Sequence, residues 1–88
     1  MSPAQPNPAR GATGIRLSLP AAQHAQVRVF DLAGRLVQTL HDGMLETGDH
    51  TFTWEGRGSH LRRADPGVYF IRVQAEGAER TTRVFLIR

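Results

Sequence analysis

Histidine is the side chain that most often transfers protons or binds metal ions near neutral pH. The 88-residue chain has four of them, His24, His41, His50 and His60. No two stand at the spacing of a zinc-binding pair, and the chain has no cysteine to supply thiolate ligands. The sequence therefore predicts neither a metal site nor a cofactor, and the histidines are expected in loops and at strand edges.

Serine and carboxylate groups are the remaining candidates for catalysis. Ser59 precedes His60 in a loop, but neighbours in sequence need not point at each other, and no strand–turn–helix elbow is evident to expose a nucleophile. Most of the acidic residues fall in turns. A carboxylate pair that cleaves glycosides also needs a substrate cleft, for which a chain of 88 residues has little room. We therefore expect a domain that is not an enzyme.

The basic residues number 11, all of them arginine, and the formal net charge is +3. Excess positive charge can indicate a polyanionic partner such as nucleic acid. Here the arginines are spread along the chain, and only Arg62 and Arg63 adjoin. This distribution favours a solvated surface over a phosphate-binding groove, so nucleic acid is not expected as a partner.

The first residues are polar and rich in proline, and they lack the apolar centre of a secretory signal. No apolar run has the length of a membrane span. Residues 1–13 include Pro3, Pro6, Pro8 and Gly11, a composition typical of a linker or an extended lead-in. We expect this lead-in to be followed by one domain over residues 14–88. If that domain acts outside the cytoplasm, it must belong to a longer chain or be carried there by a partner.

Short runs that alternate apolar and polar side chains fill the rest of the chain. Six runs have this pattern: 15–19, 27–31, 35–40, 50–54, 67–75 and 80–87. Turn-forming residues separate them, and the segment from Asp31 to Gly34 has aspartate at the first turn position and glycine at the last. Many short strands separated by turns predict an all-β protein with an antiparallel sandwich.

The alternation also assigns faces to the large side chains. Phe52 and Trp54 share one face of their strand, and Tyr69, Ile71 and Val73 share one face of theirs. These faces are expected to form the core, because an inward tryptophan is a common anchor of small sandwiches. The alternative is an exposed Trp54 or Tyr69 that stacks on sugars, as in a carbohydrate-binding module.

Three phenylalanines fall out of phase with this inward set. Phe30, Phe70 and Phe85 are expected on the outer face of a sheet, where they either cover it or form an apolar patch for a partner. In the last run, Val84 and Leu86 are predicted to point inward.

Taken in order, the motifs of the chain resemble one known family. They are the segments 27–37 (VRVFDLAGRLV), 48–50 (GDH), 54–57 (WEGR), 66–72 (PGVYFIR) and 84–88 (VFLIR). The sequence resembles the FlgD-type immunoglobulin-like domain and its relative, the C-terminal sorting domain of type IX secretion cargo. The Asn7-Pro8 dipeptide resembles the asparagine–proline opening of this family, and the resemblance extends from there to Arg88.

The resemblance implies an Ig-like sandwich of about seven short strands at the C-terminus of a larger exported bacterial protein. That protein would be secreted or held at the cell surface, with an upstream cargo domain. The implied partner is a protein, either the outer-membrane export machinery or a neighbouring subunit. Two features depart from the family: Arg83 stands near a position that is often lysine, and residues 58–64 replace the usual aspartate-containing hairpin.

Three functions remain open at this point. The first is a sorting and attachment module, and the second is a FlgD-like assembly or spacer domain. The third is a carbohydrate-binding accessory module, which requires an exposed Trp54 or Tyr69. For the first, recognition is expected to use the last hairpin and strand, through Gly67, Tyr69, Arg83, Val84, Leu86 and Arg88. Structural roles are expected for Asp31, Gly34 and Trp54.

Overall fold

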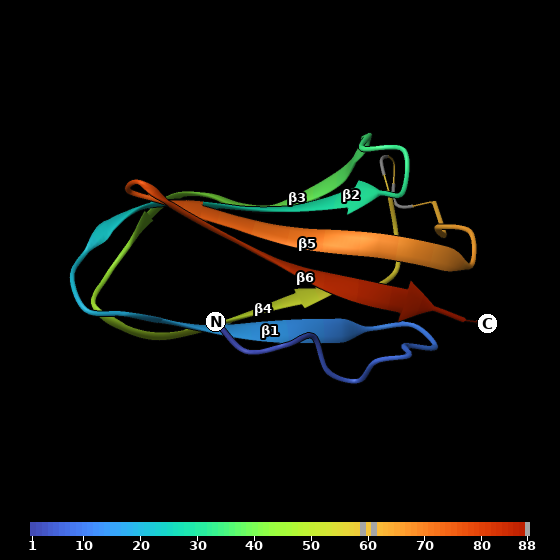
Figure 1. The fold of residues 1–88 in the computed structure, drawn as a ribbon, viewed down its shortest axis with the longest axis horizontal. Helices are drawn as coiled ribbons and strands as arrows, with labels where there is room; N and C mark the ends of the chain where they lie inside the picture. Colours follow the sequence, from blue (N-terminus) through green and yellow to red (C-terminus); the bar gives the residue numbers. More distant parts are fainter. Residues whose placement is uncertain (59, 61, 88) are drawn as a thin grey trace.

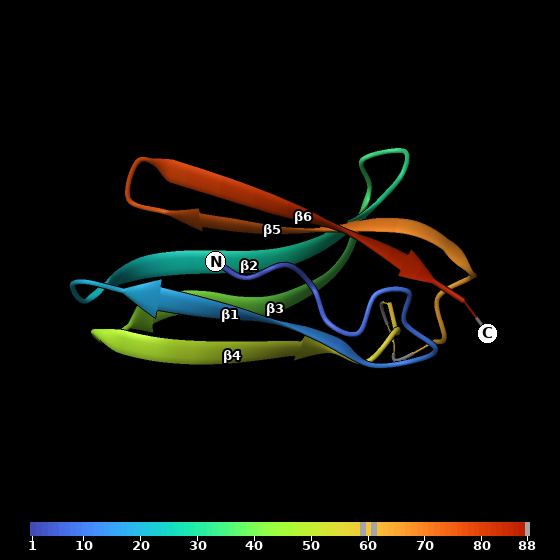
Figure 2. The ribbon, with the colours of Figure 1, turned by 60° about the horizontal axis from the view of Figure 1, so that its bottom comes forward.

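The structure is a computed structural model that describes residues 1–58, 60 and 62–87. The described residues form six strands: β1 (Thr13–Leu19), β2 (Gln23–Asp31), β3 (Leu36–Leu45), β4 (Gly48–Trp54), β5 (Gly67–Ala75) and β6 (Ala78–Leu86). Strands β1 and β4 pair in one sheet, and β3, β2, β5 and β6 form a second sheet in that order. The two sheets face each other as the layers of a sandwich (Figures 1 and 2), and the predicted all-β antiparallel class is confirmed.

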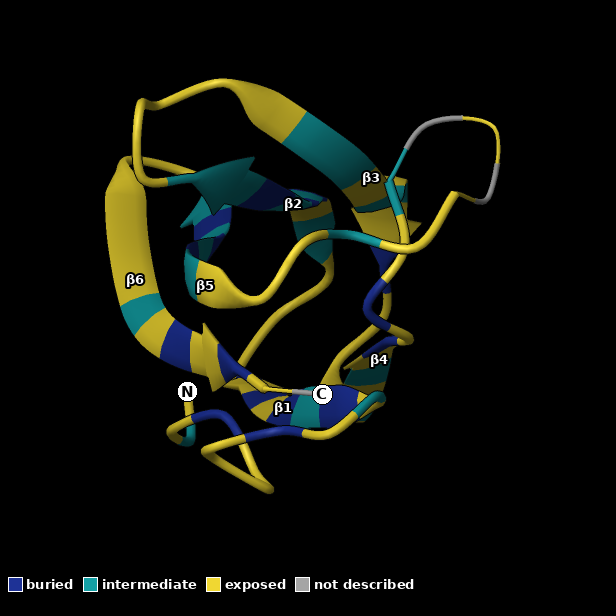
Figure 3. Cartoon of the chain, turned by 90° about the vertical axis from the view of Figure 1, so that its right-hand side faces the viewer, coloured by how far each residue is buried: buried dark blue, intermediate teal, exposed yellow. Residues whose placement is uncertain are grey.

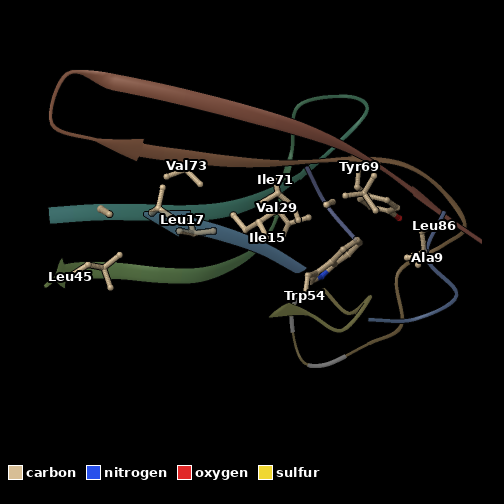
Figure 4. Close-up of a cluster of buried hydrophobic side chains, with 14 of the residues drawn as sticks. Ala9, Ile15, Leu17, Val29, Leu45, Trp54, Tyr69, Ile71, Val73 and Leu86 are labelled. Carbon is tan, nitrogen blue, oxygen red and sulfur yellow. The ribbon is translucent and has the colours of Figure 1, made fainter. Parts of the chain in front are cut away.

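Strict alternation in β2 and β5 builds the centre of the core. Val27 lies opposite Val73, and Val29 lies opposite Ile71, so one face of the larger sheet is lined by apolar side chains. Ile15 of β1 faces them from the smaller sheet, and it is fully buried. Figure 4 shows Ile15, Val29 and Ile71 close together in one layer, with Trp54 and Tyr69 toward the end where β5 begins.

Strand β3 departs from strict alternation because it has two register irregularities against β2. Val27 pairs with His41 while Arg28 pairs with Thr39, which leaves Leu40 as an extra residue. A second irregularity inserts Val37 in the same way. Bulges of this kind turn a side chain toward a different face. Both Leu40 and Val37 consequently pack against the core, although they stand three residues apart.

The lead-in lies along the open side of the sandwich and contacts both sheets (Figure 3, bottom). Gln5 exchanges two backbone hydrogen bonds of 2.9 Å with Gly14 of β1. Farther along, the Ala9 amide donates to the Phe85 carbonyl, and the Ile87 amide donates to the Ala9 carbonyl, each at 2.8 Å. The side chain of Ala9 is fully buried. Residues 2–9 therefore join the edge of β1 to the edge of β6.

Asn7 adds a side-chain clasp to this attachment. Its carboxamide nitrogen donates to the Arg83 carbonyl at 2.8 Å, and its carboxamide oxygen accepts from the Phe85 amide at 2.9 Å. The described residues form six strands where about seven were expected, and the lead-in forms the isolated bridges Gln5–Gly14 and Ala9–Leu86 in place of a strand. Its prolines lack the amide hydrogen that a continuous ladder needs.

The turn between β2 and β3 has the geometry that its sequence requires. The Gly34 amide donates to the Asp31 carbonyl at 3.0 Å, and Gly34 adopts a φ of +85°. The Asp31 carboxylate accepts from the Arg35 amide at 2.8 Å and from the Arg35 Nε at 2.9 Å. The backbone hydrogen bond from Arg35 is the main cause that holds the pKa of Asp31 below its ordinary value.

Candidate functional site

Half of the recognition residues expected from the sequence lie in the core. Tyr69, Val84 and Leu86 are 8%, 0% and 1% exposed, respectively. The Tyr69 hydroxyl donates to the Asp65 carbonyl at 2.6 Å, which anchors the segment before β5. These three side chains support the fold and offer no surface to a partner of the folded domain.

The other expected recognition residues differ in position. Gly67 is exposed at the start of β5 with a φ of +155°. Arg83 is exposed on β6, directly opposite Phe70. Arg88 lies outside the described residues. Among the members of this set that the structure describes, Arg83 is the charged residue that a partner could contact.

The carbohydrate-binding alternative loses its premise in this structure. The side chain of Trp54 is fully buried, and its indole nitrogen donates to the Arg57 carbonyl at 2.8 Å. Its ring lies 4.9 Å from that of Tyr69, at a tilt of 54°. A sugar stacks on an exposed ring face, and neither ring provides one. The expectation that Trp54 or Tyr69 could stack on sugars is therefore corrected by the burial of both residues.

The histidine and carboxylate side chains of the described residues do not gather into a metal-binding cluster. No group of three or more histidine, aspartate or glutamate side chains there is arranged to hold a metal ion. His41 and His50 instead lie beside the ring of Phe52, with ring centroids 5.5 and 6.5 Å away. No helix in the same part of the chain is long and apolar enough to span a membrane.

A wide hollow of about 840 Å³ opens at the end of the sandwich near the β2–β3 turn. Leu32, Leu36, Arg62 and Pro66 are among the residues that line it. Leu32 is 72% exposed, so much of the apolar lining faces solvent. The hollow is too open to enclose a small molecule, and enclosure is what small-molecule sites provide.

The outer face of the larger sheet has a more distinctive composition. Residues directly opposite one another across its strands form rows that change character along the sheet. The row nearest the β5–β6 turn is polar and consists of Asp42, Gln26, Gln74 and Glu79. The next row places two arginines between threonines, in the order Thr39, Arg28, Arg72 and Thr81. The third row is Leu36, Phe30, Phe70 and Arg83, and the last is the pair Val68 and Phe85. We call Arg28, Phe30, Phe70, Arg72, Arg83 and Phe85 the arginine–phenylalanine face.

Its arginines and phenylalanines are in contact. The Arg72 guanidinium carbon lies 4.3 Å from the centre of the Phe30 ring, and that of Arg83 lies 5.2 Å from the centre of the Phe85 ring. Both distances are within the range of cation–π attraction. The arrangement leaves Phe85 41% exposed, while Phe30 and Phe70 are partly exposed.

Sequence reasoning placed the phenylalanines on an outer face but missed the arginines beside them. Arg28, Arg72 and Arg83 are distant in sequence, so a search for adjacent basic residues overlooks them. The three arginines could have been found from the alternation of side chains along each strand. Each shares the alternation of a phenylalanine two residues away on its own strand, namely Phe30, Phe70 and Phe85.

The model of the FlgD Ig-like domain family matches residues 7–79 of the chain. The basal-body rod modification protein FlgD of Salmonella typhimurium is 37% identical over 62 residues, which are 70% of this chain and 26% of that protein. The Salmonella typhi protein of the same name gives the same values. The chain thus spans about a quarter of the length of the curated relatives it matches.

Solved structures with similar folds include both flagellar and secretion proteins. The FlgD structure from P. aeruginosa has a TM-score of 0.65 and 25% identity, over 88% of this chain and 62% of that one. PorZ, an essential surface component of the type IX secretion system of Porphyromonas gingivalis, has a TM-score of 0.67 and 25% identity, over 97% of this chain and 11% of that one. Dimeric latent PorU from the same bacterium has a TM-score of 0.70 at 20% identity, over 96% and 9%, a likeness of fold alone.

Proposed function

The chain belongs to the FlgD Ig-like domain family, and from this premise we propose that it is a non-catalytic sorting and attachment module for type IX secretion. In this role it is fused to a larger exported bacterial protein, and the fusion is secreted or held at the cell surface. The partner is a protein of the outer-membrane export machinery, and any catalytic activity resides in the cargo domain.

The similarity to PorZ carries this proposal. Almost the whole chain, 97% of it, aligns with 11% of PorZ at 25% identity. PorZ is itself a surface component of the type IX system, and the aligned part is a small portion of a long chain. A domain that forms one portion of a larger protein of this secretion system is consistent with a module that the system reads.

The geometry of the last strand favours recognition of a folded surface. A partner that adds a strand to a sheet needs a free edge. The edge of β6 at Arg83, Phe85 and Ile87 is already bonded to Asn7 and Ala9 of the lead-in. The side chains of Arg83 and Phe85 remain exposed beside this closed edge. The export machinery would therefore contact side chains on the sheet face.

A gain-of-function experiment tests the proposal directly. The domain is fused to the C-terminus of a periplasmic reporter enzyme in a bacterium that has a type IX system, and reporter activity is measured on intact cells. We expect surface activity with the fusion and none with the reporter alone. A fusion that is folded and protease-resistant but stays in the periplasm would refute the sorting role.

Deletion of residues 82–88 from the fusion should abolish delivery. Because the deletion also removes Val84 and Leu86 from the core, it tests the fold and the signal together. An exposed variant such as Arg83→Ala, which leaves the core intact, provides the matched test of recognition. Normal delivery of the deletion variant would contradict the proposal.

The second candidate is a FlgD-like assembly or spacer domain. The observation that favours it is the 37% identity to the basal-body rod modification protein FlgD, which exceeds the identity to PorZ. This function predicts binding to a neighbouring subunit, no surface delivery of the reporter fusion, and undisturbed export of the full-length parent protein after the same deletion. The reporter experiment therefore separates the two candidates.

A further inference from the structure

We propose that the arginine–phenylalanine face is a docking surface for an acidic protein segment that also carries apolar side chains. The inference assigns a contact surface and the chemistry of its partner. It holds whether the domain serves in sorting or in assembly, since both functions need a protein partner.

The apolar part of the face is continuous across the sheet. Phe30 and Phe70 lie directly opposite each other on β2 and β5, and Leu36 of β3 extends their row. Val68 and Phe85 form the next row. Leu36 and Phe85 are 53% and 41% exposed. Aromatic side chains and arginine are enriched in the buried centres of protein interfaces, where a few such residues supply most of the affinity.

The charged part of the face is unfavourable as it stands. Arg28 and Arg72 are directly opposite each other on neighbouring strands, and like charges in this position destabilise a sheet. Glu79 forms a long ion pair with Arg72, in which 3.7 Å separates its carboxylate oxygen from the Arg72 Nε, and this distance is too long for a hydrogen bond. That Nε is buried and has no hydrogen-bond partner, whereas the Arg72 side chain as a whole is 38% exposed and so within reach of a partner. A carboxylate brought by a partner would offset this repulsion.

The positions of the acidic groups leave room for such a carboxylate. The acidic residues on this face, Asp42 and Glu79, share the polar row nearest the β5–β6 turn, and Asp42 is engaged by His24 at 3.2 Å. The charged residues that contact Phe30 and Phe85 are Arg72 and Arg83, respectively. The ring contacts of Arg72 and Arg83 also restrict their guanidinium groups, so less side-chain entropy is lost when a carboxylate binds them.

These features favour an acidic protein over the other occupants of a sheet face. A second copy of the chain, placed face to face, would bring arginines against arginines. A polyanion such as nucleic acid or an anionic membrane needs a run of basic groups, whereas the centre of this face is the apolar pair Phe30 and Phe70. A protein segment with carboxylates around an apolar side chain matches both components.

The test uses the 88-residue chain, labelled with nitrogen-15, and a synthetic decapeptide probe with glutamates on both sides of one leucine and one phenylalanine. Binding is followed by amide chemical shifts in low salt. We expect shifts at residues of β2, β5 and β6 that flank Phe30, Phe70 and Arg83, and weaker binding as salt rises. Shifts confined to other strands, or no binding at millimolar peptide, would overturn the proposal.

Matched charge reversals locate the contact. Arg83→Glu and Arg16→Glu change the charge equally, and both positions are exposed, but Arg16 lies on β1 of the other sheet. We expect Arg83→Glu to weaken peptide binding at least about tenfold and Arg16→Glu to change it less than about twofold. Equal effects of the two substitutions would mean that net charge alone attracts the peptide, which refutes the assignment.

Two further probes distinguish the class of partner. A decaglutamate peptide and vesicles of phosphatidylglycerol present negative charge without a displayed apolar side chain. We expect both to bind at least about tenfold more weakly than the mixed peptide, because only the latter covers the phenylalanines. Equal or tighter binding of either probe would overturn the proposal in favour of a general polyanion site. The reporter assay of surface delivery has an independent readout, so failure of sorting and failure of this contact are distinguishable.

Discussion

Replacement of Asn7 with alanine is expected to destabilise the domain by loosening the lead-in from β6. The substitution removes the hydrogen bonds that the carboxamide makes with the Arg83 carbonyl and the Phe85 amide, at 2.8 and 2.9 Å. Each is an exposed bond between neutral groups, which contributes about 0.5–1.5 kcal/mol net. Together the two bonds should contribute about 1–3 kcal/mol to the free energy of unfolding, and this is the loss expected for Asn7→Ala.

The size of the domain makes such a loss easy to measure. A change of about 1 kcal/mol shifts the Tm of a domain of this size by roughly 4–8 °C. Urea unfolding can be followed through the emission of Trp54, the single tryptophan of the chain. Hydrogen exchange supplies a local readout, because the Phe85 amide loses its acceptor and should exchange faster in Asn7→Ala.

Two variants control for effects unrelated to the clasp. Gln5→Ala truncates another exposed lead-in side chain whose residue attaches through its backbone, so its stability should stay within about 0.5 kcal/mol of wild type. Asn7→Asp keeps the acceptor for the Phe85 amide but places a carboxylate oxygen against the Arg83 carbonyl, so this variant should also be less stable than wild type. If Asn7→Ala and Gln5→Ala are equally stable and exchange at the Phe85 amide is unchanged, the clasp does not attach the lead-in.

Three other substitutions test the core and the β2–β3 turn. Trp54→Ala should cost about 3–5 kcal/mol and remove most of the cooperative urea transition, which is followed here by circular dichroism because the variant has no tryptophan; a variant that retains the transition would contradict the burial of the indole. Gly34→Val should cost about 1–2 kcal/mol because of the φ of +85°, with a smaller loss for Gly34→Asn; equal stabilities by thermal unfolding would argue against the left-handed turn. Asp31 has a lowered pKa in the folded state, chiefly through the Arg35 amide, so its stabilisation is complete above the unfolded pKa and is lost as pH falls through the folded value. Asp31→Asn should accordingly be less stable than wild type at pH 6, and the difference should disappear as the pH falls through the folded pKa of Asp31; a difference of constant size from pH 6 into the acid range would contradict this linkage.

The alternation of the sequence was sufficient to predict the core where strands are regular. In β2 and β5 each inward position could be assigned by phase, and burial agrees at Val27, Val29, Ile71 and Val73. Strand β3 was harder because its two bulges depend on the partner strand. A spacing of three between Val37 and Leu40 fits no single face of a regular strand, so their common burial needs the observed register.

Contacts between residues distant in sequence could not be predicted from one chain. The neighbourhood of Arg28 and Arg72 depends on the pairing of β2 with β5, which alternation does not specify. The clasp formed by Asn7 depends on backbone atoms near the opposite end of the chain. The recognition residues were predicted from their place in the last strands, but alternate positions there face the core, as Val84 and Leu86 do.

The attachment of the lead-in to β6 has a mechanical consequence. Ala9 runs parallel to Leu86, so a pull that separates the two ends of the described chain acts along both segments in opposite directions. The hydrogen bonds of Asn7 and Ala9 to β6 would then be loaded in shear, and they must break together instead of opening one after another. In a tethered protein under drag, the contact between the lead-in and β6 would be the first part of the domain to resist unfolding by the pulling force.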